Sequence, residues 1–162
     1  MSDAGAKSQL LAQVWEINEQ QKEILFRKLW NYYHGDLAGK TVAIWGASFK
    51  ENTARIQQSP IHPMLKALWA QGVTVKLHDP QALAEIEKAY GRRADLMYCA
   101  DQYEAAKGAH ALCLLTAWKQ YWSPDYSDLL KNMSHPLLLD GRNIYDPDYV
   151  KAQGFSYRGI GR

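Results

Sequence analysis

From Thr41 onward, short apolar runs alternate with longer amphipathic segments, and this alternation limits the possible folds more than any other feature of the sequence. The apolar runs predict strands over residues 41–46, 73–78, 96–99, 109–116 and 137–140. The segments between them predict helices over residues 60–71, 81–90, 101–108 and 125–132. Strands that alternate with helices form parallel sheets with right-handed crossovers. We therefore expect an α/β fold, a doubly wound Rossmann-like parallel sheet of about five to six strands in the order 3-2-1-4-5.

A long segment without glycine or proline precedes these strands and predicts one helix over residues 9–34. Its apolar residues form two adjacent stripes, which comprise Leu10, Val14, Ile17 and Ile24, and Leu11, Trp15, Leu25 and Leu29. So wide an apolar face needs a covering surface from the following domain, from a second copy of the chain or from a domain outside this sequence. We expect a homodimer through this helix, a disordered tail at residues 1–8 and an α/β domain over residues 39–162.

Charge and hydropathy argue against two classes of partner. The net charge is only +2 and the basic residues are scattered, so the sequence offers no electrostatic surface for nucleic acid. No apolar stretch approaches the roughly 20 residues that span a bilayer. The first nine residues are polar or small, unlike a signal peptide. We therefore expect a cytoplasmic protein without a membrane partner.

The histidines and cysteines do not have the spacing of a metal site. None of the five histidines has a metal-ligand partner nearby in the sequence, and we interpret them as surface or loop residues. Cys99 and Cys113 are too far apart for a CxxC motif and lie in apolar runs. We expect both to be buried reduced thiols, and we expect no metal.

Two basic residues follow predicted strands and are the candidates for binding a ligand. Phe49-Lys50 comes shortly after the strand over residues 41–46, and Arg142 lies within residues 140–143, at the end of the last predicted strand. Ligands of parallel sheets bind outside the carboxyl ends of the strands, where lysine and arginine suit phosphate groups. Their spacing alone is equally consistent with exposed loop cations. Because residues 46–53 form neither GxGxxG nor a Walker A loop, the residues by themselves indicate a domain that binds a phosphorylated small molecule.

The same segments resemble the motifs of a known family. Residues 46–53 with Ser59-Pro60 resemble the GLAFKxNTDDxRESPS signature of the UDP-glucose/GDP-mannose dehydrogenase family. Four further segments, residues 78–80, 116–118, 140–143 and 157–162, resemble its YDP, TEW, DGRN and Y-x-GIGR motifs, and residues 17–22 resemble the VNxxQ segment of its central helix. Within the family, the pattern is most similar to the UDP-glucose 6-dehydrogenases.

This resemblance implies a function and a place in a larger protein. In the family, an amino-terminal NAD domain and a carboxy-terminal nucleotide-sugar domain are joined by a long helix that also builds the dimer. The enzymes oxidise the sugar C6 alcohol twice, from UDP-glucose to UDP-glucuronate, with two NAD and a cysteine thiohemiacetal. The resemblance identifies this chain as the central helix and the carboxy-terminal domain, with Phe49, Lys50 and Arg142 bound to the UDP-sugar.

Two departures from the family pattern limit what this chain is expected to do. The GGxCxPKD loop of the catalytic cysteine and the GxGxxG turn are missing from the sequence, so we expect no catalytic residue here and no turnover by this chain alone. NAD is expected to bind mainly to the amino-terminal domain. Inside the signature, Ala54, Arg55, Gln57 and Gln58 replace two aspartates, an arginine and a glutamate, which leaves Arg55 and Gln57 as the candidates on the cofactor side. The alternative is a non-catalytic nucleotide-sugar-binding or dimerisation module derived from the family.

Overall fold

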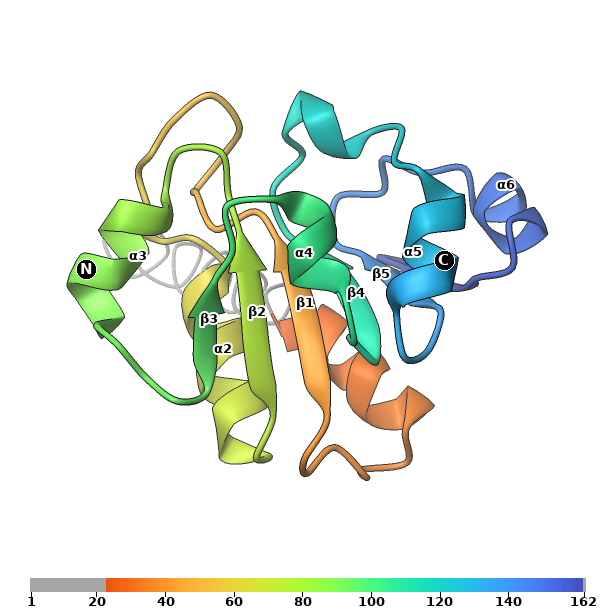
Figure 1. Cartoon of the computed structure of the whole chain (residues 1–162), viewed down its shortest axis with the longest axis horizontal. Coiled ribbons are helices and arrows are strands. Elements are labelled where there is room, and N and C mark those ends of the chain that lie inside the picture. Colours follow the sequence, from red (N-terminus) through yellow and green to blue (C-terminus); the bar gives the residue numbers. More distant parts are fainter. Residues whose placement is uncertain (1–22, 162) are drawn as a thin grey trace, which may run out of the picture.

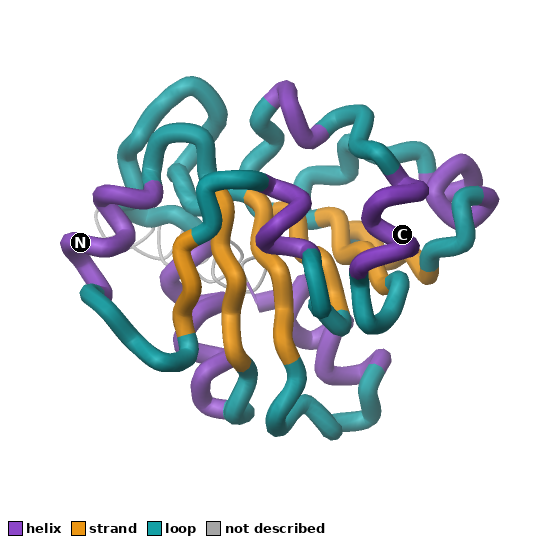
Figure 2. The backbone as a smooth tube through the Cα atoms, in the orientation of Figure 1, coloured by secondary structure: helices purple, strands orange, loops and turns teal. Residues whose placement is uncertain are grey.

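The computed structural model describes residues 23–161, which form a parallel sheet covered by helices on both faces (Figures 1 and 2). The six strands are β1 (Thr41–Trp45), β2 (Thr74–His78), β3 (Leu96–Tyr98), β4 (Ala111–Leu114), β5 (Leu137–Asp140) and β6 (Ser156–Gly159). Their order is β3-β2-β1-β4-β5-β6, and every neighbouring pair is parallel. The doubly wound fold and the predicted order of the first five strands are therefore confirmed, and a sixth strand extends the sheet beyond β5.

The connecting helices are α2 (Ile61–Ala70), α3 (Leu83–Tyr90), α4 (Gln102–Ala106), a 3₁₀ turn η1 (Lys119–Tyr121), α5 (Tyr126–Asn132) and α6 (Pro147–Ala152). Of these, α2, α3, α4 and α5 lie close to the predicted ranges, and η1 has no predicted counterpart. Asp101 caps α4, because its carboxylate accepts the backbone N–H groups of Tyr103 and Glu104. No strand or helix was expected between residues 141 and 162, where α6 and β6 lie.

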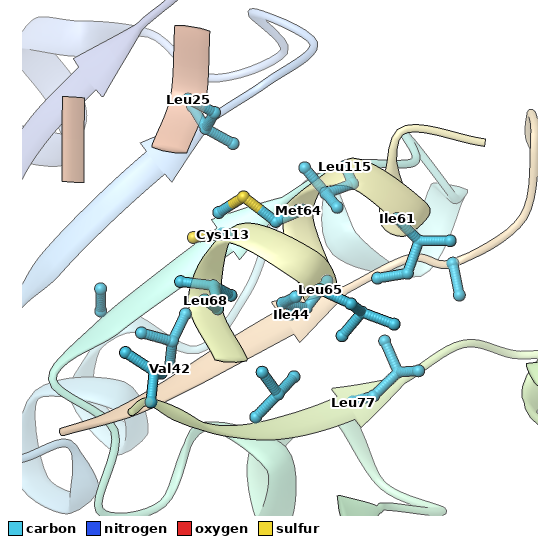
Figure 3. Close-up of a cluster of buried hydrophobic side chains, with 14 of the residues drawn as sticks. Leu25, Val42, Ile44, Ile61, Met64, Leu65, Leu68, Leu77, Cys113 and Leu115 are labelled. Atoms are coloured by element: carbon cyan, nitrogen blue, oxygen red, sulfur yellow. The ribbon is translucent and has the colours of Figure 1, made fainter. Parts of the chain in front are cut away.

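Alternate residues of each strand face two separate cores. On one face, Val42 and Ile44 of β1 join a cluster with α2, α3 and the first helix. Figure 3 shows Met64, Leu65 and Leu68 of α2 lying against this strand. On the other face, Ala43 and Trp45 join a cluster with α4, α5 and α6. Strands covered on both sides are apolar throughout, which is why β4 and β5 consist almost entirely of buried apolar residues.

The first helix is described over residues 23–32, and it packs on the domain that follows it. Leu25 and Leu29, from the second apolar stripe, are 2% and 0% exposed in the core. The Tyr32 hydroxyl donates a hydrogen bond of 3.1 Å to Ser156 Oγ at the start of β6. The following domain therefore covers this part of the stripe. The expected tail at residues 1–8 and residues 9–22 of the expected helix lie outside the described residues, and the boundaries at 9–34 and 39–162 remain predictions.

One expectation about the histidines is wrong. His78 at the end of β2 is only 4% exposed, and its Nδ1 lies 2.6 Å from the Tyr121 hydroxyl. Burial lowers the pKa of His78, although the neighbouring Asp79 carboxylate opposes the shift. The side chain is buried because η1 brings Tyr121 over the end of β2, a contact that local sequence does not encode.

The cysteines are buried and free, as expected, and burial raises the pKa of both thiols. Across residues 23–161, no helix has the length and apolar character needed to cross a membrane.

The docking of the first helix can be tested through Leu29. Leu29→Ala removes a fully buried side chain and should lower the free energy of unfolding by about 2–4 kcal/mol, measured by urea denaturation. Asn31→Ala on the exposed side of the same helix is the control and should change it by about 0.5 kcal/mol or less. Equal effects of the two substitutions would contradict the docking.

Candidate functional site

The candidate site lies at the edge of the sheet where the parallel strands end. The chain leaves β1 toward α2 on one face of the sheet, and leaves β4 toward α5 on the other face. Since β1 and β4 are neighbours, their two loops separate above the sheet, as the gold and teal loops at the top of Figure 1 show. Open parallel sheets bind their ligands at such a switch point.

Asp79, directly after β2, fixes the first of these loops. Its side chain is 3% exposed and accepts N–H groups from two neighbouring segments. Oδ2 accepts hydrogen bonds from Ala47 N at 2.8 Å, Ser48 N at 3.1 Å and Trp118 Nε1 at 3.1 Å. Oδ1 accepts hydrogen bonds from Gln81 N and Ala82 N, at 2.8 Å each. A buried carboxylate is tolerated when its oxygens are saturated with donors in this way. Asp79 therefore joins the ends of β1, β2 and β4 without a cationic partner in the described residues.

Three further side chains hold the same loop. Thr116 Oγ1 donates to the Ser48 carbonyl at 2.8 Å, and Trp118 Nε1 also lies 3.1 Å from Ser48 Oγ. Ser59 Oγ donates to the Ala47 carbonyl at 2.8 Å from the far end of the loop. Ser48, Ser59 and Thr116 are at most 1% exposed. The backbone of residues 47 and 48 is consequently fixed from three sides.

Gly46 allows this close packing. Its φ is +98°, and a Cβ atom there would lie 2.5 Å from Thr116 Cβ and 2.6 Å from Thr116 N. A side chain at residue 46 would push apart the two loops that form the switch point.

Asp140 performs a similar task at the end of β5. It is 0% exposed, and it accepts the Arg142 backbone N–H at 3.1 Å, the Tyr145 N–H at 3.0 Å and the Tyr157 hydroxyl at 2.8 Å. Asn143, at a φ of 54°, exchanges two hydrogen bonds of 2.9 Å with the backbone of Ile160. The turn that carries Arg142 is therefore tied to β6 and to the segment after it.

The side chains predicted to bind ligand are the ones that this framework leaves exposed. Phe49 is 42% exposed, and Lys50 and Arg142 are also exposed at the carboxyl edge of the sheet. Within residues 23–161, neither the Lys50 ammonium nor the Arg142 guanidinium has a hydrogen bond or ion pair. The two cations do not touch each other, because β4 separates the strands that carry them. Arg55 and Gln57, the weaker candidates, are exposed in the β1–α2 loop.

Sequence reasoning missed the residues that build the framework. Asp79, Thr116 and Trp118 were recognised only as parts of motifs, and Ser48 and Ser59 had no role assigned. The available signal was the position of polar residues directly after apolar strands, where a buried side chain must find hydrogen-bond partners. Within the described residues, no group of histidine, cysteine and acidic side chains could hold a metal ion.

Comparison with known proteins identifies related sequences and structures. Residues 43–147 match the UDP-glucose/GDP-mannose dehydrogenase family, UDP binding domain. UDP-glucose 6-dehydrogenase of Pseudomonas aeruginosa is 42% identical over 161 residues, which cover 98% of this chain and 36% of that protein. UDP-glucose 6-dehydrogenase of Rhizobium meliloti is 36% identical over 90% of this chain and 33% of its own length. The solved UDP-glucose dehydrogenase of Pyrobaculum islandicum aligns with a TM-score of 0.74 at 26% identity, covering 91% of this chain and 31% of that one.

These relatives are much longer than the chain itself. The chain spans only about a third of the length of the curated relatives that it matches. The similarity therefore concerns one part of such a protein.

The role of Asp79 predicts a large effect of a nearly isosteric change. Asp79→Asn places an NH₂ group where two or three backbone and indole N–H groups now donate, so the free energy of unfolding should fall by about 3–5 kcal/mol in urea denaturation. The control is Asp146→Asn, an exposed helix cap that asparagine fills equally well, with an expected change below about 0.5 kcal/mol. A small effect at Asp79 would mean that the hydrogen bonds do not fix the loop.

The close contact at Gly46 predicts that alanine destabilises the protein more at this glycine than at Gly39. Gly46→Ala should cost about 3 kcal/mol or more, because overpacking against Thr116 adds to the unfavourable φ. Gly39→Ala has a similar φ of +80° with nothing within 4 Å of the added Cβ, and it should cost about 1 kcal/mol. Thermal unfolding of both variants measures the difference, and equal costs would rule out the steric contact as its source.

Proposed function

The chain belongs to the UDP-glucose/GDP-mannose dehydrogenase family, whose UDP-binding domain matches residues 43–147, and from this premise we propose that it binds the UDP-sugar substrate of a UDP-glucose 6-dehydrogenase. The reaction of such an enzyme is the NAD-dependent oxidation of UDP-glucose to UDP-glucuronate. In this proposal the chain binds the nucleotide, and another part of the protein carries out the oxidation.

The observation that carries the proposal is the contrast between buried and exposed residues at the carboxyl edge. The buried carboxylates of Asp79 and Asp140 accept hydrogen bonds from backbone N–H groups. The charged groups of Lys50 and Arg142 are exposed to solvent and have no partner among residues 23–161. Two cations at one edge of the sheet suit the two phosphates of a nucleoside diphosphate, and arginine can bind phosphate in a bidentate manner. Phe49, 42% exposed beside Lys50, offers an aromatic surface for the nucleotide.

The chemistry of oxidation finds no support in the described residues. Cys99 and Cys113 are buried, and burial raises the pKa of both thiols, so neither resembles the thiolate nucleophile that a thiohemiacetal requires. The turn after β1 does not fit NAD in the manner of a GxGxxG turn, because Ser48 and Glu51 stand at the positions of its second and third glycines. We propose that NAD is bound by an amino-terminal domain of a longer enzyme, and that the helix predicted over residues 9–34 joins the two domains and forms a homodimer.

The substitutions inside the signature favour a second candidate function. Ala54, Arg55, Gln57 and Gln58 replace the charged residues of the family pattern, and all but Ala54 are exposed in the β1–α2 loop. A module that had lost its contact with the cofactor side would tolerate these changes. Such a module would remain a stable dimer without affinity for nucleotide sugars.

Calorimetric titration of the chain with UDP-glucose tests the proposal, with GDP-mannose as the comparison ligand. Lys50→Ala and Arg142→Ala should each weaken UDP-glucose binding by about 1.5–3 kcal/mol, because each removes a charged hydrogen bond to phosphate. Lys66→Ala on α2 and Arg92→Ala before β3 remove the same charges from other exposed positions and should leave the affinity unchanged.

Equal losses in all four variants would indicate an effect of net charge, and the assignment of Lys50 and Arg142 would then fail. Absence of binding to both sugars by the folded chain, together with a dimer in sedimentation velocity, would favour the second candidate function.

A further inference from the structure

The part of the β1–α2 loop that carries Lys50 has an unfavourable backbone. Within residues 50–58, Gln58 has a φ of 62°, in the left-handed region that non-glycine residues seldom occupy, and Asn52 has a φ of 67°, which asparagine tolerates. The loop closes on itself through a backbone hydrogen bond of 2.6 Å, from Phe49 N to the Arg55 carbonyl. Such a conformation persists only where surrounding structure holds it. Asp79, Thr116 and Ser59 hold residues 47 and 48, and the Ser48 hydroxyl donates to the Lys50 carbonyl at 2.8 Å, but none of these hydrogen bonds reaches the outer segment, residues 51–58.

His62, in the first turn of α2, contacts the outer segment directly. Its Nε2 lies 2.6 Å from the carbonyl oxygen of Ile56, which also accepts the Ser59 N–H at 3.1 Å. A carbonyl oxygen can only accept, so Nε2 carries the hydrogen. In the neutral ring Nδ1 is then bare, and it accepts the Tyr90 hydroxyl hydrogen at 2.5 Å. Both ring nitrogens are occupied, and the tautomer is set by the two partners.

Tyr90 is itself held in place. It is the last residue of α3, and its ring packs against Trp69 of α2 with centroids 5.5 Å apart at 72°. Burial raises the pKa of Tyr90, which keeps its hydroxyl protonated and able to donate. The indole of Trp69 donates to the Asp95 carbonyl at 3.0 Å, and the Arg93 guanidinium lies 3.7 Å from the Trp69 ring centre. His62 therefore connects the loop to a packed assembly formed by α2, α3 and the start of β3.

We infer that His62 is a positioning residue for the nucleotide-sugar site, which holds the Ile56 carbonyl so that residues 50–58 present Lys50 in its binding position. This inference rests on the proposed function for its link to ligand affinity, although its structural part can be tested without ligand. His62 touches no substrate in this proposal. It acts through the backbone of the loop.

The test compares two substitutions at residue 62. His62→Phe keeps an aromatic ring beside Tyr90 but removes both hydrogen bonds, and it should weaken UDP-glucose binding by about threefold to tenfold in calorimetry. His62→Gln retains an N–H donor and a carbonyl acceptor, and it should restore most of the affinity. His34→Asn, at an exposed residue with a φ of 53° that asparagine tolerates, is the control for the loss of a histidine and should bind like the unsubstituted chain.

Amide hydrogen exchange gives a second measurement on the ligand-free chain. His62→Phe should speed exchange of the Phe49 and Ser59 amides, which donate within the loop, by about tenfold, with little change at Leu77, which is buried in β2. His62→Gln should exchange like the unsubstituted chain. Unchanged exchange in His62→Phe would overturn the inference whether or not the chain binds a sugar.

The two readouts separate the inference from the proposed function. If the unsubstituted chain fails to bind UDP-glucose while His62→Phe loosens the loop, the proposed function is at fault and the positioning role stands. If the unsubstituted chain binds and both His62→Phe and His62→Gln bind equally well, the positioning role is wrong and the proposed function stands. A uniform rise in exchange across the sheet would show general destabilisation, which also overturns the inference.

Discussion

The buried carboxylate of Asp79 is the interaction on which the arrangement of this edge depends. It follows β2, yet its oxygens accept N–H groups from the loop after β1 and from Trp118 after β4. A charge in a site so far from water is stable only when donors surround it, so the three strand ends must stay together to supply them. Asp140 has the same role at the end of β5. Its carboxylate accepts the Arg142 backbone N–H and the Tyr157 hydroxyl, and so joins the turn that carries Arg142 to β6.

This arrangement divides the family motifs into two physical classes. Residues with short polar side chains, such as Ser48, Thr116 and Asn143, donate hydrogen bonds to backbone carbonyls and so fix the loops. Phe49, Lys50 and Arg142 lie next to them in sequence and are left exposed. The first class makes the loops rigid, and rigidity lowers the entropic cost of placing the second class around a ligand. In the proposed function, binding therefore depends on buried residues that do not contact the nucleotide.

The function proposed for the chain follows the same logic. A site made of two cations and an exposed ring can hold a nucleoside diphosphate, but residues 23–161 contain no accessible thiol and no complete GxGxxG turn. Binding and oxidation are then tasks for different parts of a longer protein, consistent with relatives of which this chain spans about a third. In the proposed enzyme the first helix, which docks on this domain through Leu25 and Leu29, connects it to the other part.

The sequence by itself determined the doubly wound sheet and its strand order, because apolar alternation and the handedness of parallel crossovers leave few other topologies. It also placed Lys50 and Arg142 at one edge, since parallel strands all end on the same side. Only the tertiary structure decided which polar residues are buried there. Asp79, His78 and His62 take their partners from residues distant in sequence, such as Trp118, Tyr121 and Tyr90. Local pattern cannot specify those contacts, because they exist only once separate strands and helices have packed together.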